Sequence, residues 1–219
     1  MSKPLAPAWG PLAMVALFGV TACTSPPPAP PSAPPPPTAG FTATLVSPTD
    51  IVLRWPDDDS GVAGRMVEYA TAPEGPFTTL QFLPARQSSY THPDLIPETP
   101  FYYRLRPFSG PVTDPIEVGA SPGGSGGDPA APGDPLAVII DSNDNVRFTW
   151  TDRAQGESGY LLEVRKPGSA EFVPVEVADP DSTSSVLAEL PDEHGAAYRI
   201  RAFFYGPQSP VVHQTTGKD

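Results

Sequence analysis

Residues 55–69 read WPDDDSGVAGRMVEY, and residues 150–164 read WTDRAQGESGYLLEV. The two stretches align without a gap at an offset of 95 residues, and they share a Trp, an Asp, two glycines and a Glu. The same offset places LIPETPFYYRLR (95–106) on LPDEHGAAYRIR (190–201). Similarity at one fixed offset is the sequence signature of repeated structural units. The chain is therefore expected to hold two copies of one domain.

Each copy alternates apolar and polar residues with a period of two, as in 51–55, 101–106, 146–150 and 160–165. This period is typical of strands with one face buried. Turn-forming stretches rich in Gly, Asp, Asn and Pro separate the strands. No segment of helical length has a 3.6-residue apolar stripe. The pattern predicts an all-β chain with two tandem β-sandwiches.

The order of motifs within each copy resembles a fibronectin type III domain. These motifs are a strand ending in Trp, a polar loop and strand, then a Leu, a Pro and an Arg-aliphatic-Arg strand end. They are LRW (53–55), MVEYA (66–70) and LIPETPFYYRLR in the first copy, and FTW (148–150), GYLLEV (159–164) and LPDEHGAAYRIR in the second. The resemblance implies two immunoglobulin-like sandwiches and suggests an interaction module or spacer.

The expected cores centre on one Trp per copy, because a buried indole ring removes about 150–250 Å² from water. The other expected core positions are aromatic or aliphatic residues of the repeated motifs. The full set is Trp55, Tyr69, Leu95, Tyr103 and Leu105 in the first copy, and Trp150, Leu190, Tyr198 and Ile200 in the second.

The expected boundaries place the first fibronectin type III-like domain at 41–121 and the second at 134–219. Between them, residues 122–133 form a linker rich in Gly and Pro. A flexible linker of this composition predicts two domains that move independently.

The first 40 residues have a different character. Residues 1–22 combine Lys3 with a nine-residue apolar run, which is typical of an export signal and too short to span a bilayer as a helix. The sequence VTAC that ends at Cys23 resembles the bacterial lipobox. That resemblance implies cleavage before Cys23 and its lipidation, with Thr24 favouring the outer membrane over the inner one.

Two alternatives stay open for this segment. Ordinary signal peptidase cleavage would release a soluble protein with a free thiol, and an uncleaved segment would act as an anchor. Lipidation accounts for the only cysteine of the chain, since an unpaired cysteine in an exported protein needs an explanation. Several acyl chains would hold the protein stably on the membrane. In this interpretation, residues 23–40 are the lipidated cysteine and a Pro-rich stalk with polyproline II character.

Charge excludes one class of partner. The chain of 219 residues has a formal net charge of −12, and both expected domains are acidic. Nucleic acid binding requires a basic face, so we expect no nucleic acid partner.

The sequence offers little material for catalysis. His92, His194 and His213 lie far apart, and no metal-binding His spacing, nucleophile elbow or phosphate-binding loop is present. The run Asp57–Asp59 invites comparison with calcium loops, yet only Asp152 and Glu157 remain in the second copy. We interpret this loop as solvated. We expect no enzyme, no catalytic residue, no metal and no cofactor.

Two further patterns involve charged and aromatic residues. Glu68 and Glu163 recur, with Arg-x-Arg pairs later in each copy, and we interpret them as ion pairs across solvent-facing strands. Tyr102, Phe203 and Phe204 are the candidate binding residues. They belong either under a C-terminal strand or on an exposed platform for a protein or sugar.

The expected function is non-catalytic binding or display by a lipid-anchored surface protein. Its partners would be the membrane and an envelope protein or polysaccharide. One alternative is a passive spacer or envelope-organising protein without a ligand. Another is an accessory subunit of an extracytoplasmic enzyme.

Overall fold

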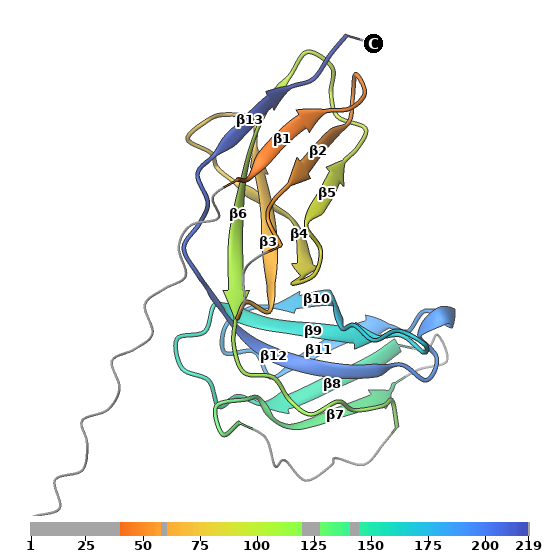
Figure 1. Ribbon diagram of the computed structural model, residues 1–219. Coiled ribbons are helices and arrows are strands. Elements are labelled where there is room, and N and C mark those ends of the chain that lie inside the picture. Colours follow the sequence, from red (N-terminus) through yellow and green to blue (C-terminus); the bar gives the residue numbers. More distant parts are fainter. Residues whose placement is uncertain (1–39, 58–60, 120–127, 141–144, 219) are drawn as a thin grey trace, which may run out of the picture. The chain divides into compact units, whose positions relative to one another are not determined.

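The computed structural model describes residues 40–57, 61–119, 128–140 and 145–218. Within these residues the chain has thirteen strands, one short 3-10 turn and no α-helix. The prediction of an all-β fold with two sandwiches is confirmed (Figure 1). None of the described residues belongs to a helix able to cross a bilayer.

The first repeat supplies six strands. They are β1 (Thr42–Leu45), β2 (Ile51–Arg54), β3 (Gly64–Ala70), β4 (Thr78–Pro84), β5 (Ser89–His92) and β6 (Pro100–Ser109). One sheet has the order β1-β2-β5, and the facing sheet contains β4, β3 and β6, all paired antiparallel. We call this the first sandwich.

The second repeat forms the same arrangement. Its elements are β7 (Gly133–Ile139), β8 (Asn145–Thr151), β9 (Gly159–Arg165), β10 (Val173–Ala178), β11 (Ser184–Ala188), the 3-10 turn η1 (Pro191–Glu193) and β12 (Ala197–Tyr205). One sheet has the order β11-β8-β7, and the facing sheet contains β10, β9 and β12. We call this the second sandwich.

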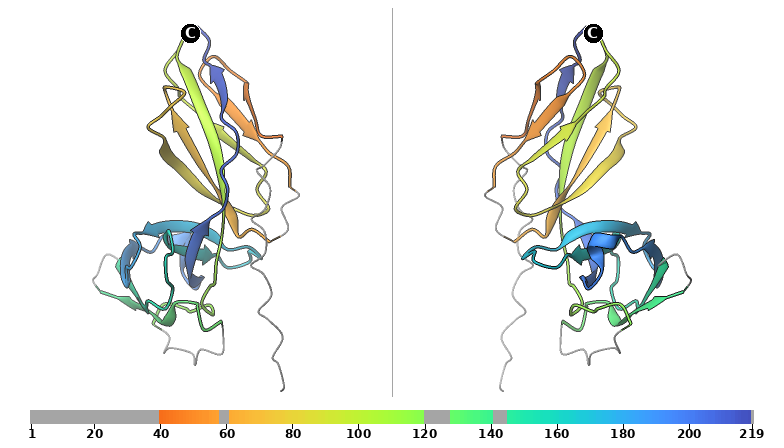
Figure 2. Two further views of the ribbon diagram at one scale, coloured as in Figure 1. Left: turned by 90° about the vertical axis from the view of Figure 1, so that its left-hand side faces the viewer. Right: turned by 90° about the vertical axis from the view of Figure 1, so that its right-hand side faces the viewer.

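The edge strand next to β6 comes from the far end of the chain. β13 (Val212–Thr215) pairs antiparallel with β6, with Val212 opposite Tyr103. Figure 2 shows this blue strand running beside β6 from both sides. The first sandwich is therefore closed by residues that follow the second repeat.

The second sandwich is closed in the reciprocal way. The segment after β6 bridges to β12 at Val112↔Arg201 and at Ile116↔Tyr198. Thr113 N donates to Ile200 O at 2.9 Å, and Ile200 N donates to the Thr113 hydroxyl at 3.1 Å. This differs from the expected boundaries, which assign 41–121 to the first domain and everything from 134 onward to the second.

The two closing segments make matching hydrogen bonds to the sandwiches that they close. Ser209 N donates to Leu105 O at 2.7 Å, and Leu105 N donates to the Ser209 hydroxyl at 2.9 Å, which reproduces the bonds between Thr113 and Ile200. Leu105 and Ile200 occupy matching positions of the repeat. Sequence similarity therefore could not show which sandwich each segment joins.

Three groups of buried residues hold the fold together. The core of the first sandwich surrounds Trp55, and that of the second surrounds Trp150. A third group, Phe108, Leu161 and Phe203, combines residues of both repeats, with Phe203 5.4 Å from the ring of Phe82 and 6.0 Å from that of Phe108. The strands β6 and β12 also pair at their ends, with Tyr205 opposite Phe108.

Candidate functional site: the arginine–aromatic groove

A buried carboxylate with two arginines marks the β9–β12 pair of the second sandwich. Glu163 on β9 is 2% exposed. Its carboxylate accepts hydrogen bonds from Nε of Arg199 at 2.5 Å and from Nε of Arg201 at 2.8 Å. Nη1 of Arg201 also donates to Gly110 O at 2.7 Å, and Gly110 begins the segment that crosses from β6. Two cations share one anion here, so one positive charge is left uncompensated by this carboxylate.

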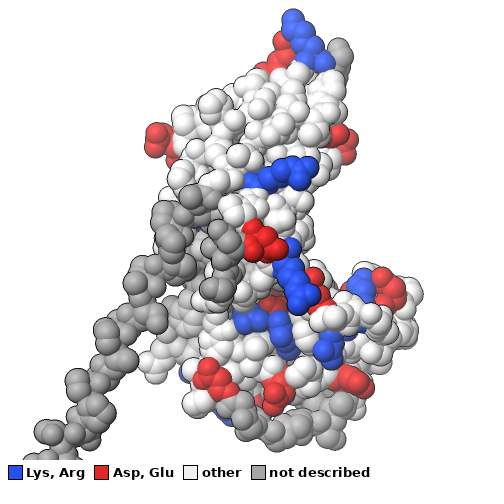
Figure 3. All heavy atoms as spheres, viewed as in Figure 1, with Lys and Arg blue, Asp and Glu red and all other residues white. Residues whose placement is uncertain are grey.

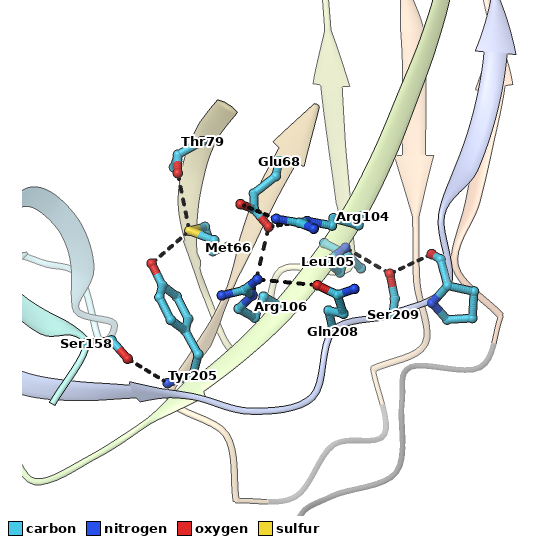
Figure 4. A network of polar contacts seen from close by, with 11 residues as sticks. Met66, Glu68, Thr79, Arg104, Leu105, Arg106, Ser158, Tyr205, Gln208 and Ser209 are labelled. Carbon is cyan, nitrogen blue, oxygen red and sulfur yellow. Dashed lines mark hydrogen bonds and ion pairs between the residues drawn. The ribbon is translucent and has the colours of Figure 1, made fainter. Parts of the chain in front are cut away.

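The first sandwich repeats this pattern on β3 and β6. Nε of Arg104 lies 2.7 Å from Glu68 Oε2, and Nε of Arg106 lies 3.9 Å from the same oxygen (Figure 4). Glu68 is buried, with 6% exposure. The expected cross-strand ion pairs are present, but the expectation that both glutamates face solvent is wrong. The arginines and their neighbours cover these carboxylates.

Aromatic rings lie under the guanidinium groups in both sandwiches. The guanidinium carbon of Arg104 lies 4.1 Å from the centre of the Phe77 ring, and that of Arg199 lies 4.0 Å from Phe172. The guanidinium carbon of Arg165 lies 4.8 Å from the centre of the same Phe172 ring. Such cation–π contacts fix the planar groups in orientation, and they leave guanidinium edges as hydrogen-bond donors.

A groove of about 460 Å³ lies where residues of the two repeats meet. Its charged lining comprises Arg86, Arg199, Arg201 and Glu171, with Phe172 as its aromatic residue. Arg86 is exposed and, within the described part of the chain, forms no ion pair. Figure 3 shows several basic side chains, with acidic ones between them, across the middle of one face of this acidic protein. We call this the arginine–aromatic groove.

A polar network fixes the end of β12 against the first sandwich (Figure 4). The Tyr205 hydroxyl donates to Met66 Sδ at 3.1 Å, and the ring of Tyr205 lies 4.8 Å from the guanidinium carbon of Arg106. Nη2 of Arg106 donates to Gln208 Oε1 at 3.3 Å. Burial raises the pKa of the Tyr205 phenol, with Arg106 opposing the shift. The hydroxyl therefore stays protonated as a donor.

The structure places most of the sequence-predicted core residues inside. Eight of the nine lie in the two cores or against them: Trp55, Leu95, Tyr103, Leu105, Trp150, Tyr198 and Ile200 are buried, and the half-buried Tyr69 packs on the first core. Leu190 is the correction, because it is 51% exposed. Its backbone N–H donates to Glu193 Oε2 at 3.2 Å as η1 begins, and this turn directs the Leu190 side chain to solvent.

The three candidate binding aromatics have different environments. Phe203 is 1% exposed and belongs to the third buried group, so the structure does not support its use as a binding platform. Tyr102 is half-buried and stacks on His213 at 5.7 Å. Phe204 is half-buried beside Ser109. The sequence could not show that Phe203 faces another repeat instead of solvent.

The structure does not assemble the histidines into a site. His92 Nδ1 lies 3.1 Å from the Tyr103 hydroxyl in the first core, and His213 lies on β13. Among the described residues, one set of three carboxylates could hold a metal ion: Asp152, Glu157 and Asp181.

Several sequence predictions fall outside the described residues. These are the export signal, Cys23, the Pro-rich stalk, Asp58 and Asp59 of the acidic loop, and residues 120–127 around the expected linker.

Comparison with known proteins gives matches to solved structures alone. No protein-family model matches the sequence, and no curated protein sequence is significantly similar to it. The fn3 domain of human collagen alpha-1(XX) chain is 22% identical, with a TM-score of 0.31, over 35% of this chain and 72% of that one. The FN1–FN3 domains of chicken CNTN1 are 16% identical, with a TM-score of 0.31, over 84% of this chain and 68% of that one.

A computationally redesigned β-sandwich protein is 23% identical, with a TM-score of 0.29, over 33% of this chain and 77% of that one. At these TM-scores, the sandwich architecture rests on the strand pairing of the chain itself. Two such sandwiches are compatible with a non-catalytic binding or structural role.

Proposed function

We propose that this chain is a lipid-anchored protein of the cell envelope that binds, without catalysis, a partner bearing carboxylates. The partner is an acidic protein segment or an acidic polysaccharide. The lipobox at Cys23 supports the anchoring, and the arginine–aromatic groove supports the binding. An accessory role for an enzyme has no specific support from the described residues.

The observation that carries the binding proposal is the excess of guanidinium groups in the groove. Arg199 and Arg201 share the single carboxylate of Glu163, and Arg86 adds an exposed cation from the other repeat. Against these three cations stand the carboxylates of Glu163 and of Glu171 in the lining, so one positive charge remains in excess. Guanidinium groups pair with carboxylates in a planar, two-bond geometry. A local positive site in a chain of net charge −12 favours an anionic ligand over a neutral one.

Arg86 is the position at which to test this proposal, because its exposed side chain can be removed without disturbing a buried pair. We expect the full chain to bind alginate and poly-glutamate in preference to neutral dextran, and we expect added NaCl to weaken the binding. Arg86→Ala should weaken it roughly two- to fivefold, as for a solvent-accessible ion pair. Affinity is measured by biolayer interferometry on the immobilised polymers.

The matched control is Arg54→Ala, which removes an exposed arginine on β2 outside the groove. An equal loss in both variants would mean that binding reflects overall charge and not the groove. If neither acidic polymer binds better than dextran, the passive spacer becomes the better account. Cys23→Ser tests the anchor separately, since it should move the protein from the membrane pellet to the soluble fraction.

A further inference from the structure

Three acidic side chains that are distant in sequence converge beside the second core. Asp152 follows β8, Glu157 lies in the loop before β9, and Asp181 lies in the turn between β10 and β11. A carboxylate oxygen of each lies within 4.8 Å of those of the other two. The sequence prediction of no metal considered Asp152 and Glu157, but it could not include Asp181.

Glu157 is the unusual member of this group. Its side chain is 6% exposed, and its Oε1 accepts a hydrogen bond from the backbone N–H of Asp181 at 3.0 Å. Its Oε2 is buried and has no hydrogen-bond partner among the described residues. A buried carboxylate oxygen without a partner is costly, because it loses its hydration and gains nothing in return.

No basic side chain compensates this group. Within the described ranges, none of the three carboxylates has a Lys, Arg or His nitrogen within 4.0 Å. Elsewhere in the protein the buried glutamates Glu68 and Glu163 each have arginine partners. Among the described residues, Glu157 is thus a buried glutamate without a basic partner.

A neighbouring tyrosine positions one carboxylate of this group. The Tyr160 hydroxyl donates to Asp152 Oδ1, which also accepts from Ala154 N at 3.0 Å. These two hydrogen bonds hold the Asp152 carboxylate in place.

The first repeat provides an internal comparison. At the offset of 95 residues, Asp57, Val62 and Arg86 stand where the second repeat has Asp152, Glu157 and Asp181. One carboxylate is thus replaced by an apolar side chain and another by a cation. The convergence is consequently a property of the second sandwich and not of the fold.

We propose that Asp152, Glu157 and Asp181 form a calcium site in the second sandwich. The donors are all oxygens, which suits a hard divalent cation and disfavours zinc or copper. A set with one buried and one exposed carboxylate leaves room for water ligands. Calcium accepts irregular sets of carboxylate and water oxygens, whereas magnesium requires near-octahedral geometry.

The test uses the full chain after treatment with EDTA. Titration with CaCl2 in a calorimeter should show one ion bound per chain, with a Kd of about 0.1–1 mM, as in extracellular calcium modules. At 5 mM calcium, the Tm of the chain should rise by about 2–9 °C. The fluorescence of Trp150 should follow, because its ring lies 5.3 Å from that of Tyr160. Magnesium should bind at least tenfold more weakly.

Two variants separate ion binding from folding. Glu157→Gln should abolish calcium binding, and its Tm without calcium shows whether the second sandwich still folds. Asp181→Asn keeps an exposed residue that tolerates the positive φ of 59° at this position, so it should stay folded and bind at least fivefold more weakly. Asp114→Asn, at an exposed carboxylate outside the group, is the charge-matched control and should bind like the parent.

Absence of calorimetric binding at 5 mM calcium in the folded parent chain would overturn the proposal. Unchanged affinity in Asp181→Asn would do the same, as would equal binding of magnesium. Binding of alginate by the chain in calcium-free buffer tests the arginine–aromatic groove. This measurement does not depend on calcium, so a failure of the calcium site and a failure of the groove can be told apart.

Discussion

At the scale of single residues, the buried glutamates determine how the arginines of this protein are held. Glu163 accepts hydrogen bonds from two guanidinium groups, and one of these, Arg201, also holds the backbone of the crossing segment at Gly110. One carboxylate thereby links β9, β12 and the connection from the first sandwich. Its loss should be felt well beyond the ion pair itself.

We therefore expect Glu163→Gln to destabilise the protein by about 3–5 kcal/mol, because it leaves the buried Arg201 and the half-buried Arg199 without their counter-charge. The free energy of unfolding is measured by urea denaturation. Asp192→Asn is the control, since it removes a solvent-exposed partner of Lys166 and should change the unfolding midpoint little. Similar effects of the two substitutions would contradict this view of Glu163.

A second prediction concerns pH and His92. Burial lowers the pKa of His92 from its usual 6.5, so the folded state favours the neutral ring that contacts Tyr103. The unfolded chain then binds more protons than the folded chain as the pH falls below 6.5. His92 should contribute stability that is present above about pH 6.5 and lost as the pH decreases through its folded pKa.

The measurement compares Tm at pH 7.5 and pH 5.5 in the parent chain and in His92→Gln. The parent should lose more stability between these values than the variant does, and His213→Gln on β13 serves as the control. An identical pH dependence in the parent and in His92→Gln would assign the effect to other groups.

At the scale of elements, β13 is the strand whose position departs most from expectation. It follows the second repeat in sequence and pairs with β6 of the first. If consecutive domains formed instead, β13 would lie beside β12. The two arrangements make opposite predictions about which strand loses its partner when β13 is removed.

Deletion of residues 208–219 should therefore expose β6 and leave most of β12 protected. The reason is that β12 retains its hydrogen bonds to Thr113 and Ile116, whereas β6 loses every bond to Val212–Thr215. Hydrogen exchange read by mass spectrometry resolves the peptides 100–107 and 197–203. Faster hydrogen exchange confined to the β12 peptide would rule out the pairing of β13 with β6.

At the scale of the whole molecule, much of the fold could be predicted from the repeat and from the two-residue period. The strands of the two copies lie at the expected offset, as with β3 at Gly64–Ala70 and β9 at Gly159–Arg165. Most expected core residues are buried because alternation fixes which face of a strand turns inward. The local pattern was sufficient to predict burial for residues whose packing partners belong to the same repeat.

The features that sequence could not predict depend on contacts across longer distances. Phe203 is buried by Phe82 and Phe108 of the other repeat, and Asp181 reaches Glu157 through the turn between two strands. Leu190 is exposed because Pro191 starts a 3-10 turn that the first repeat lacks at Leu95. Period and composition contain no information about such partners.

The pairing of β13 with β6 of the first sandwich also determines how the protein would respond to mechanical tension. The chain enters the first sandwich at β1 and returns to it at β13, so the second sandwich is inserted between two strands of the first. A pull between residues 40 and 217 is borne by β1 and β13 before it reaches β7–β12. The second sandwich is thereby shielded from load until β13 is stripped from β6.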